Sequence, residues 1–160
     1  MSYQNIPSGS VLDYIRQHFL GKLITESRSP AGNWLQLTLD KIERGAADIS
    51  LTVRPEMCNP YGNIHGGMMS LVIDEAIGWA VVSLNTDNNY TSLNLNVDFL
   101  YAIRQGERLK ARSNVIREGK KIIHVECSVY DMQDRLLGKA SSNLIVTGMK
   151  PRDGDFKVAS

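Results

Sequence analysis

Residues 65–84, HGGMMSLVIDEAIGWAVVSL, are the stretch that decides the fold. From Met68 to Leu84 this stretch is almost continuously apolar, and only Asp74 and Glu75 bring charge into it. Its length favours a helix over a strand. A helix that is apolar nearly all round is typical of a buried position, so we expect it in the middle of the domain. Residues 85–89, NTDNN, end it.

The segments around this helix mostly alternate apolar and polar residues, a period that predicts β-strands. We expect strands at residues 34–40, 46–54, 90–100, 107–117, 122–131 and 136–147. An amphipathic helix is expected at 8–20, capped by Ser8 or Ser10 and ended by Gly21, and a turn is expected at 29–33. An antiparallel sheet with one apolar face needs a second layer, and only the long helix is apolar enough to supply it. The predicted class is therefore α+β, with a curved antiparallel sheet wrapped around one long central helix.

Length, charge and composition exclude several classes of protein. The 160 residues suit one domain, and the formal net charge of +1 gives no reason to expect nucleic acid or an anionic membrane as a partner. The N-terminus lacks the pattern of a signal peptide, and the apolar stretch is too short and too charged to cross a bilayer comfortably. We therefore expect a cytoplasmic protein. Two cysteines and three histidines show no metal-ligand spacing, so neither a metal nor a cofactor is expected.

The two adjacent acids of the long helix have different neighbours, because residues three, four and seven apart share a helix face. Three small residues share the face of Asp74: Gly67, Ser70 and Gly78. Three bulky residues share the face of Glu75: Leu71, Val72 and Trp79. Another chain or a ligand can approach closely along the Asp74 face. The alternative is that Asp74 pairs with a buried donor and that the small residues serve only helix packing.

The start of this helix offers backbone donors. Gly66 and Gly67 place N–H groups at a helix N-terminus, where such donors suit the oxyanion that develops in acyl transfer. The alternative is that the two glycines only permit a tight turn. Asp74 lies eight residues beyond Gly66, a rise of roughly 12 Å along the axis. If the two act on one reacting group, they must come from different subunits, which predicts a twofold dimer with two shared sites.

Asn59, His65-Gly66-Gly67, Leu71 and Asp74 together resemble the signature of hotdog-fold thioesterases of the phenylacetate-degradation type. In that family an Asn precedes His-Gly-Gly by six positions and an acid follows the His by nine, and both spacings hold here. The similarity runs from about Trp34 to Thr147. It implies a hotdog thioesterase domain at 33–147, after an N-terminal helix and linker at 1–32 and before a flexible tail at 148–160.

The resemblance also implies roles for four residues. Asp74 is expected to act as the nucleophile or as the general base that activates water, and Gly66 to donate its N–H to the thioester carbonyl. Asn59 is expected to position the water or the carbonyl, and His65 to order its loop. A thioester carries a fair leaving group, so one carboxylate and one oxyanion donor suffice without a metal. The expected activity is hydrolysis of an acyl-CoA to a carboxylic acid and free coenzyme A.

Five further residues are expected at the substrate. Gly67 and Ser92 are expected near the reacting group, Ser92 because relatives carry a polar residue at the matching position. Arg117, Gly119 and Lys120 belong to a turn that resembles the one meeting the nucleotide end of coenzyme A, whose phosphates suit cations. Without the resemblance, this turn reads as a solvated hairpin.

Other interpretations stay open at this point. Some relatives place a Thr or Ser one turn after the acid, where this chain has Gly78. A non-catalytic acyl-CoA-binding protein, a hotdog protein that has lost useful activity, and a hydratase of the same fold are the alternatives. Aromatic, short and medium acyl groups are all compatible with the sequence. The resemblance further implies a tetramer built as a dimer of dimers.

Overall fold

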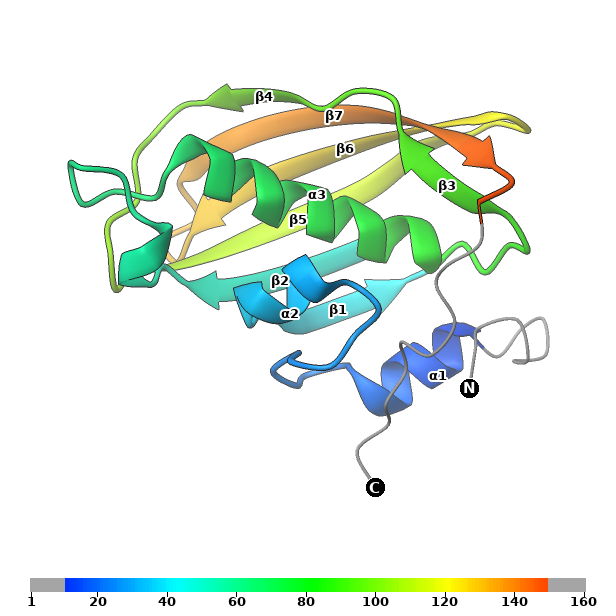
Figure 1. Ribbon diagram of the computed structural model, residues 1–160, viewed down its shortest axis with the longest axis horizontal. Coiled ribbons are helices and arrows are strands. Elements are labelled where there is room, and N and C mark those ends of the chain that lie inside the picture. The colour runs from blue at the N-terminus through cyan, green and yellow to red at the C-terminus, as the bar shows by residue number, and fades with distance from the viewer. Residues whose placement is uncertain (1–10, 150–160) are drawn as a thin grey trace.

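The computed structural model describes residues 11–149, which form one curved sheet with helices on its concave side (Figure 1). The elements, in chain order, are α1 (Val11–His18), α2 (Pro30–Leu35), β1 (Thr38–Glu43), β2 (Ala46–Thr52), the 3-10 helix η2 (Pro55–Met57), α3 (Gly66–Val82), β3 (Asn89–Ser92), β4 (Asn96–Phe99), β5 (Arg108–Glu118), β6 (Ile122–Asp131) and β7 (Leu136–Thr147). The expected α+β class and hotdog arrangement are confirmed.

All strand pairs of the sheet are antiparallel. The order is β1-β2-β5-β6-β7-β3, and β4 also pairs with β7. Helix α3 crosses the concave face and packs mainly against β2, β5 and β6 (Figure 1). Alternate residues of these strands point toward it and are buried, as in the run Ala47, Ile49, Leu51. Burial of this apolar face against α3 supplies the main favourable term of folding.

The N-terminal segment differs from the prediction in two places. The first helix begins at Val11 and ends at His18, and its expected caps Ser8 and Ser10 lie outside the described residues. Residues 30–35 form α2 instead of a turn followed by a strand. The reason is a good helix start, because the Ser29 hydroxyl accepts a hydrogen bond from the Gly32 N–H and Pro30 occupies the first helical position. Gln36 then ends the helix in the left-handed conformation, with φ 54°.

The strand expected at residues 90–100 is also wrong, because it is two strands, β3 and β4. Between them side chains replace the regular backbone ladder with β7. Asn94 Oδ1 accepts a hydrogen bond from the Asn143 N–H at 2.9 Å, and the Ser142 hydroxyl donates to the Asn94 carbonyl at 2.8 Å. These contacts satisfy the Asn143 N–H of β7 and the Asn94 carbonyl of the connecting segment, as side chains of Asn and Ser commonly do.

Helix α3 is not buried all round, although its sequence is apolar nearly throughout. The residues that face the sheet, such as Val72, Ile73 and Ile77, are fully buried. Asp74 and Gly78 lie on the opposite side and are exposed. This exposed side is the small-residue face that the sequence predicts, and it is where a further molecule can reach the helix.

Candidate active site

The start of α3 is organised by His65. His65 is the N-cap of α3, and its Nδ1 accepts a hydrogen bond from the Gly67 N–H at 2.9 Å. The proton of the neutral ring therefore belongs on Nε2, an assignment that follows from this hydrogen bond. The expectation that both glycine N–H groups are available needs correction, because the cap occupies that of Gly67. For the Gly66 N–H the described residues provide no hydrogen-bond acceptor, as is common in the first turn of a helix.

The loop that delivers His65 is shaped by Asn59. The Asn59 side-chain oxygen accepts hydrogen bonds from the Tyr61 N–H at 3.0 Å and the Asn63 N–H at 3.2 Å. The His65 N–H then donates to the Met57 carbonyl at 2.9 Å, which closes the loop. Asn59 thus folds the loop back so that α3 begins at Gly66, and within one chain its oxygen is committed to that task.

Asp74 lies in the middle of α3 on its exposed side. Partial burial against the helix and its surroundings raises the pKa of its carboxyl above the ordinary value, and a hydrogen bond with Ser92 acts in the opposite direction. The side chain still reaches solvent, so water or a ligand has access to it. Ser92 ends β3, and the structure therefore brings this predicted residue to the predicted acid. A carboxylate with a raised pKa and an open approach suits the transfer of a proton from water.

Glu75, the next residue, lies in different surroundings. The Ser29 hydroxyl donates a 2.5 Å hydrogen bond to Glu75 Oε1 while accepting one from the Gly32 N–H at 3.0 Å. A Cβ at Gly32 would collide with Glu75 Oε2. Burial raises the pKa of the Glu75 carboxyl, the Ser29 hydrogen bond opposes this rise, and the charge of Asp74 adds to it. Sequence reasoning missed this link, although Ser29-Pro30 is a recognisable helix start.

Gly66 and Asp74 are not brought together within one chain. They are separated by eight residues of the same helix, or roughly 12 Å of axial rise. Beside Gly66 the nearest side chain is the ring of Phe99, whose Cζ would lie 3.4 Å from a Cβ at that position. A second helix start is needed if an N–H donor is to reach the reacting group at Asp74.

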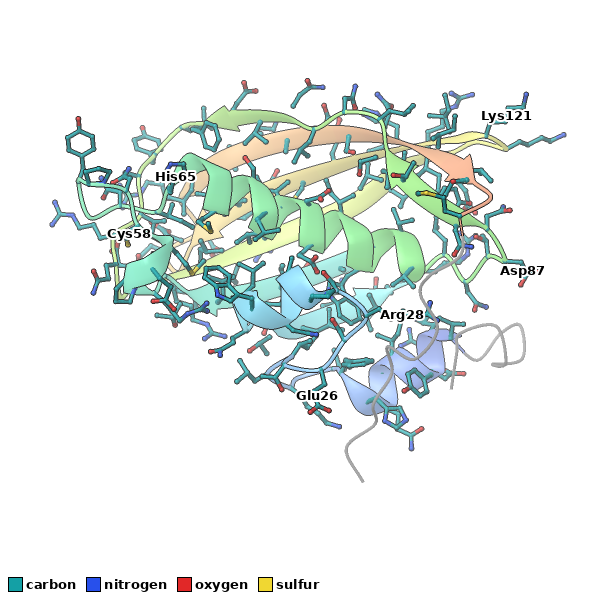
Figure 2. All side chains as sticks on the ribbon, in the orientation of Figure 1. Glu26, Arg28, Cys58, His65, Asp87 and Lys121 are labelled. Carbon is teal, nitrogen blue, oxygen red and sulfur yellow. The ribbon has the colours of Figure 1, made fainter. Side chains whose placement is uncertain are left out.

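The basic turn joins β5 to β6 at the end of the molecule opposite the start of α3 (Figure 2). Lys121 in this turn and His65 at the start of α3 lie at opposite ends of the molecule in Figure 2. Gly119 makes the turn possible, because a Cβ there would clash with the Ile122 carbonyl, to which the Gly119 N–H donates. Glu118 pairs with Arg44 at 2.9 Å. Lys120 lies in this turn and Arg117 lies in β5, one residue before its end, and together with Gly119 they form the expected site for phosphate groups.

The edge of the sheet at β3 and β4 exposes large apolar side chains. Phe99 and Leu93 are 56% and 55% exposed, and Leu100 and Tyr101 follow them on the same segment. Such a patch on the edge of a sheet is typical of a surface that another chain covers. The alternation of residues 90–100 predicted an apolar face here, but not that a single chain leaves it exposed.

Residues 11–149 contain neither a candidate metal site nor a candidate membrane-spanning helix. Within these residues no three His, Cys, Asp or Glu side chains gather as ligands for a metal ion. The helices of the same part of the chain include none with the length and apolar character needed to cross a membrane.

The chain is similar in sequence to a thioesterase family and to several known proteins. Residues 61–137 match the model of the thioesterase superfamily. A protein of Saccharolobus solfataricus, itself named only provisionally as an esterase, is 26% identical over 71% of this chain and 75% of its own length. Human acyl-coenzyme A thioesterase 13 is 22% identical over 79% of this chain and 86% of its own.

Solved structures show the same fold. The PaaI protein from the phenylacetic acid degradation operon of Escherichia coli has a TM-score of 0.71 at 21% identity, with 75% of this chain and 86% of that chain covered. A thioesterase-like protein of Streptococcus pneumoniae, solved with coenzyme A, has a TM-score of 0.67 at 23% identity, with 71% and 88% covered. At these identities the likeness establishes the fold.

Proposed function

We propose that this chain, which belongs to the thioesterase superfamily and is a thioester hydrolase, acts on acyl-CoA and releases a carboxylic acid and free coenzyme A. The observation that carries the proposal is Asp74, an accessible carboxylate with a raised pKa, hydrogen-bonded to Ser92 on the exposed side of α3. Similarity to human acyl-coenzyme A thioesterase 13 and to a structure that contains coenzyme A supports this choice of substrate.

The chemistry assigned to Asp74 has two forms. As a general base, the carboxylate takes a proton from water, the water oxygen bonds to the thioester carbonyl carbon, and the C–S bond breaks to release the thiolate. As a nucleophile, the carboxylate attacks the same carbon, the thiolate leaves, and water then hydrolyses the resulting anhydride. In either form negative charge develops on the carbonyl oxygen, and the Gly66 N–H is the donor that we assign to it.

The donor and the carboxylate belong to different subunits in this proposal. The separation of Gly66 and Asp74 along α3 is too great for one thioester group to contact both. In a twofold dimer with antiparallel α3 helices, the partner brings its Gly66 toward the Asp74 of the first chain. The exposed apolar edge at β3 and β4 supports an association of this kind. A tetramer of two such dimers extends the same proposal.

The remaining residues position the groups that react. His65 and Asn59 hold the start of α3, where the Gly66 N–H has no acceptor among the described residues. Ser92 orients the Asp74 carboxylate. Arg117, Gly119 and Lys120 are assigned to the phosphates of coenzyme A, since two cations and a tight backbone turn suit such groups. These assignments place the nucleotide at the end of the sheet opposite the start of the chain's own α3 (Figure 2).

A non-catalytic acyl-CoA-binding protein is the second candidate. The observation that favours it is Gly78, because no side chain stands one turn after Asp74 to hold the attacking water. A Cβ at that position would meet no atom within 4 Å. The two candidates predict the same ligand and differ in whether a thiol is released.

The test is thiol release from a panel of phenylacetyl, hydroxybenzoyl, short, medium and long acyl-CoA substrates, measured for wild type and Asp74→Ala. We expect release by wild type and a loss of about 10²-fold or more in the variant, with circular dichroism and oligomeric state unchanged. Activity that survives Asp74→Ala contradicts the assigned mechanism. Binding of acyl-CoA without any thiol release favours the second candidate.

A further inference from the structure

A cavity of about 150 Å³ lies beside α3, on the side of the helix that faces residues 27–29. Its lining includes Ser29, Glu75, Gly78, Trp79 and Val82. Arg28, labelled in Figure 2 near the C-terminal half of α3, also lines the cavity. An apolar cavity of this volume holds a molecule the size of benzene, or about six carbon atoms.

The cavity connects with the exposed side of α3 at Gly78. Gly78 is exposed and lies one turn beyond Asp74, and a Cβ there would meet no atom within 4 Å. Position 78, which lines the cavity, therefore carries no side chain that would separate the cavity from Asp74. One helical turn is about 5.4 Å, the reach of a chain of about four to six carbons from a carbonyl held at Asp74.

The lining of the cavity combines apolar side chains with side chains that accept hydrogen bonds. Trp79 and Val82 supply apolar surface. The Ser29 hydroxyl has already used its proton on Glu75 Oε1 and accepts from the Gly32 N–H. The Glu75 carboxylate has about four lone-pair positions, of which Ser29 occupies one. Glu75 lines the cavity and its carboxylate keeps capacity to accept a further hydrogen bond, so a ligand that binds to it must bring the donor.

A neutral donor suits these walls better than a cationic one. The raised pKa of Glu75 shows that burial already disfavours charge at this position. An ammonium group would bring a second charge out of water, and Arg28, which also carries a positive charge, lines the same cavity. A hydroxyl group donates one hydrogen bond and adds no charge.

We propose that this cavity receives the far end of the acyl group, and that Glu75 selects acyl chains of about six carbons that carry a hydroxyl group near that end. This inference rests on the proposed thioesterase activity and names the substrate class of the same site. The acyl chain passes Gly78 on its way from Asp74 into the cavity, and Glu75 is the specificity-determining residue. The absence of a side chain at position 78 then serves the entry of substrate.

The experiment compares hexanoyl-CoA with 4-, 5- and 6-hydroxyhexanoyl-CoA as substrates of the full chain. We expect wild type to show kcat/KM about tenfold higher for one of the hydroxylated chains, since a hydrogen bond that hexanoyl-CoA cannot make is worth about such a factor. Glu75→Leu removes the acceptor and is expected to abolish the preference. Glu75→Gln keeps the volume and one acceptor oxygen, and we expect it to retain a reduced preference with the fold intact.

The outcomes separate this inference from the activity on which it rests. Equal kcat/KM for hexanoyl and all hydroxyhexanoyl substrates in wild type overturns it, and so does a preference that survives Glu75→Leu. Hydrolysis of other panel members with no turnover of these four substrates also overturns it. If wild type releases thiol from no acyl-CoA at all, the proposed function itself has failed, and the inference falls with it.

Discussion

Two neighbouring acids of α3, Asp74 and Glu75, lie on different sides of the helix and have different surroundings. On the exposed side Asp74 touches Ser92 and keeps access to solvent. On the side toward residues 27–32, Glu75 is fixed by the Ser29 hydroxyl at the start of α2. Both carboxyls have raised pKa values with burial as the main cause. Burial alone therefore does not mark the reactive group, and access together with the neighbouring donor distinguishes the two.

Helix α3 begins at Gly66, where the largest further effect is expected. Gly66→Pro deletes the N–H, and proline is tolerated at the first position of a helix, after a residue in extended conformation such as His65. We expect kcat to fall by about 10²–10³, the usual cost of one oxyanion donor. The measurement is thiol release together with a thermal unfolding curve.

The matched variant at this position is Gly66→Ala, which keeps the N–H. Its Cβ would lie 3.4 Å from the Phe99 ring, an ordinary contact. We expect a much smaller loss than for proline. Equal losses in the two variants would show that shape, and not the donor, matters at this position.

The contact between Ser92 and Asp74 predicts a change in pH dependence. The reactive form of Asp74 is the anion, so kcat/KM is lost as pH falls through its raised pKa. The Ser92 hydrogen bond lowers that pKa, so Ser92→Ala should move the acid limb of kcat/KM to higher pH. The measurement is a pH profile between about pH 4 and 8.

Ser128→Ala, in β6 and away from α3, serves as the control for this profile, and its acid limb is expected to match that of wild type. An acid limb that stays in place in Ser92→Ala would mean that Ser92 does not act on the group that limits activity.

The smallest expected effects are on stability. They concern Gly32, which lies beside Glu75, and Gly78, which lies one turn after Asp74. Gly32→Ala places a methyl group against the Glu75 carboxylate and within 3.2 Å of the Ser29 Cβ. We expect this overpacking to lower the free energy of unfolding by about 1–3 kcal/mol. Gly78 lies at an interior position of α3, and a Cβ there would meet no atom within 4 Å. We therefore expect Gly78→Ala to raise the free energy of unfolding by about 0.5–1 kcal/mol. Urea unfolding measures both, and effects of the same sign would contradict the contrast drawn here.

The parts of the fold that sequence predicted well are those with long periodic patterns. The bounds of β6 and β7 agree with the prediction, and α3 lies where its apolar run indicated. The errors occur where a tertiary contact outweighs local alternation. Trp34 and Leu35 fit a strand pattern, yet they end α2, because Ser29 caps that helix.

The candidate site was predictable to the extent that it depends on one helix. The period of 3.6 residues placed Asp74 and Gly78 on a common side, and the structure exposes both. The link from Ser29 to Glu75 joins residues 46 positions apart, so no local pattern contained it. The occupation of the Gly67 N–H by His65 was also missed, because a histidine side chain as an N-cap acceptor is uncommon.

The shared site is the central claim, and subunit complementation tests it most directly. Asp74→Asn and Gly66→Pro are co-expressed with different affinity tags, and the heterodimer is purified by both. One of its two sites then carries both changes, while the other combines an intact Asp74 with an intact Gly66 from the other subunit. We predict that the heterodimer recovers about half of wild-type activity, as twofold symmetry requires. A heterodimer no more active than the two inactive parents would contradict the shared site.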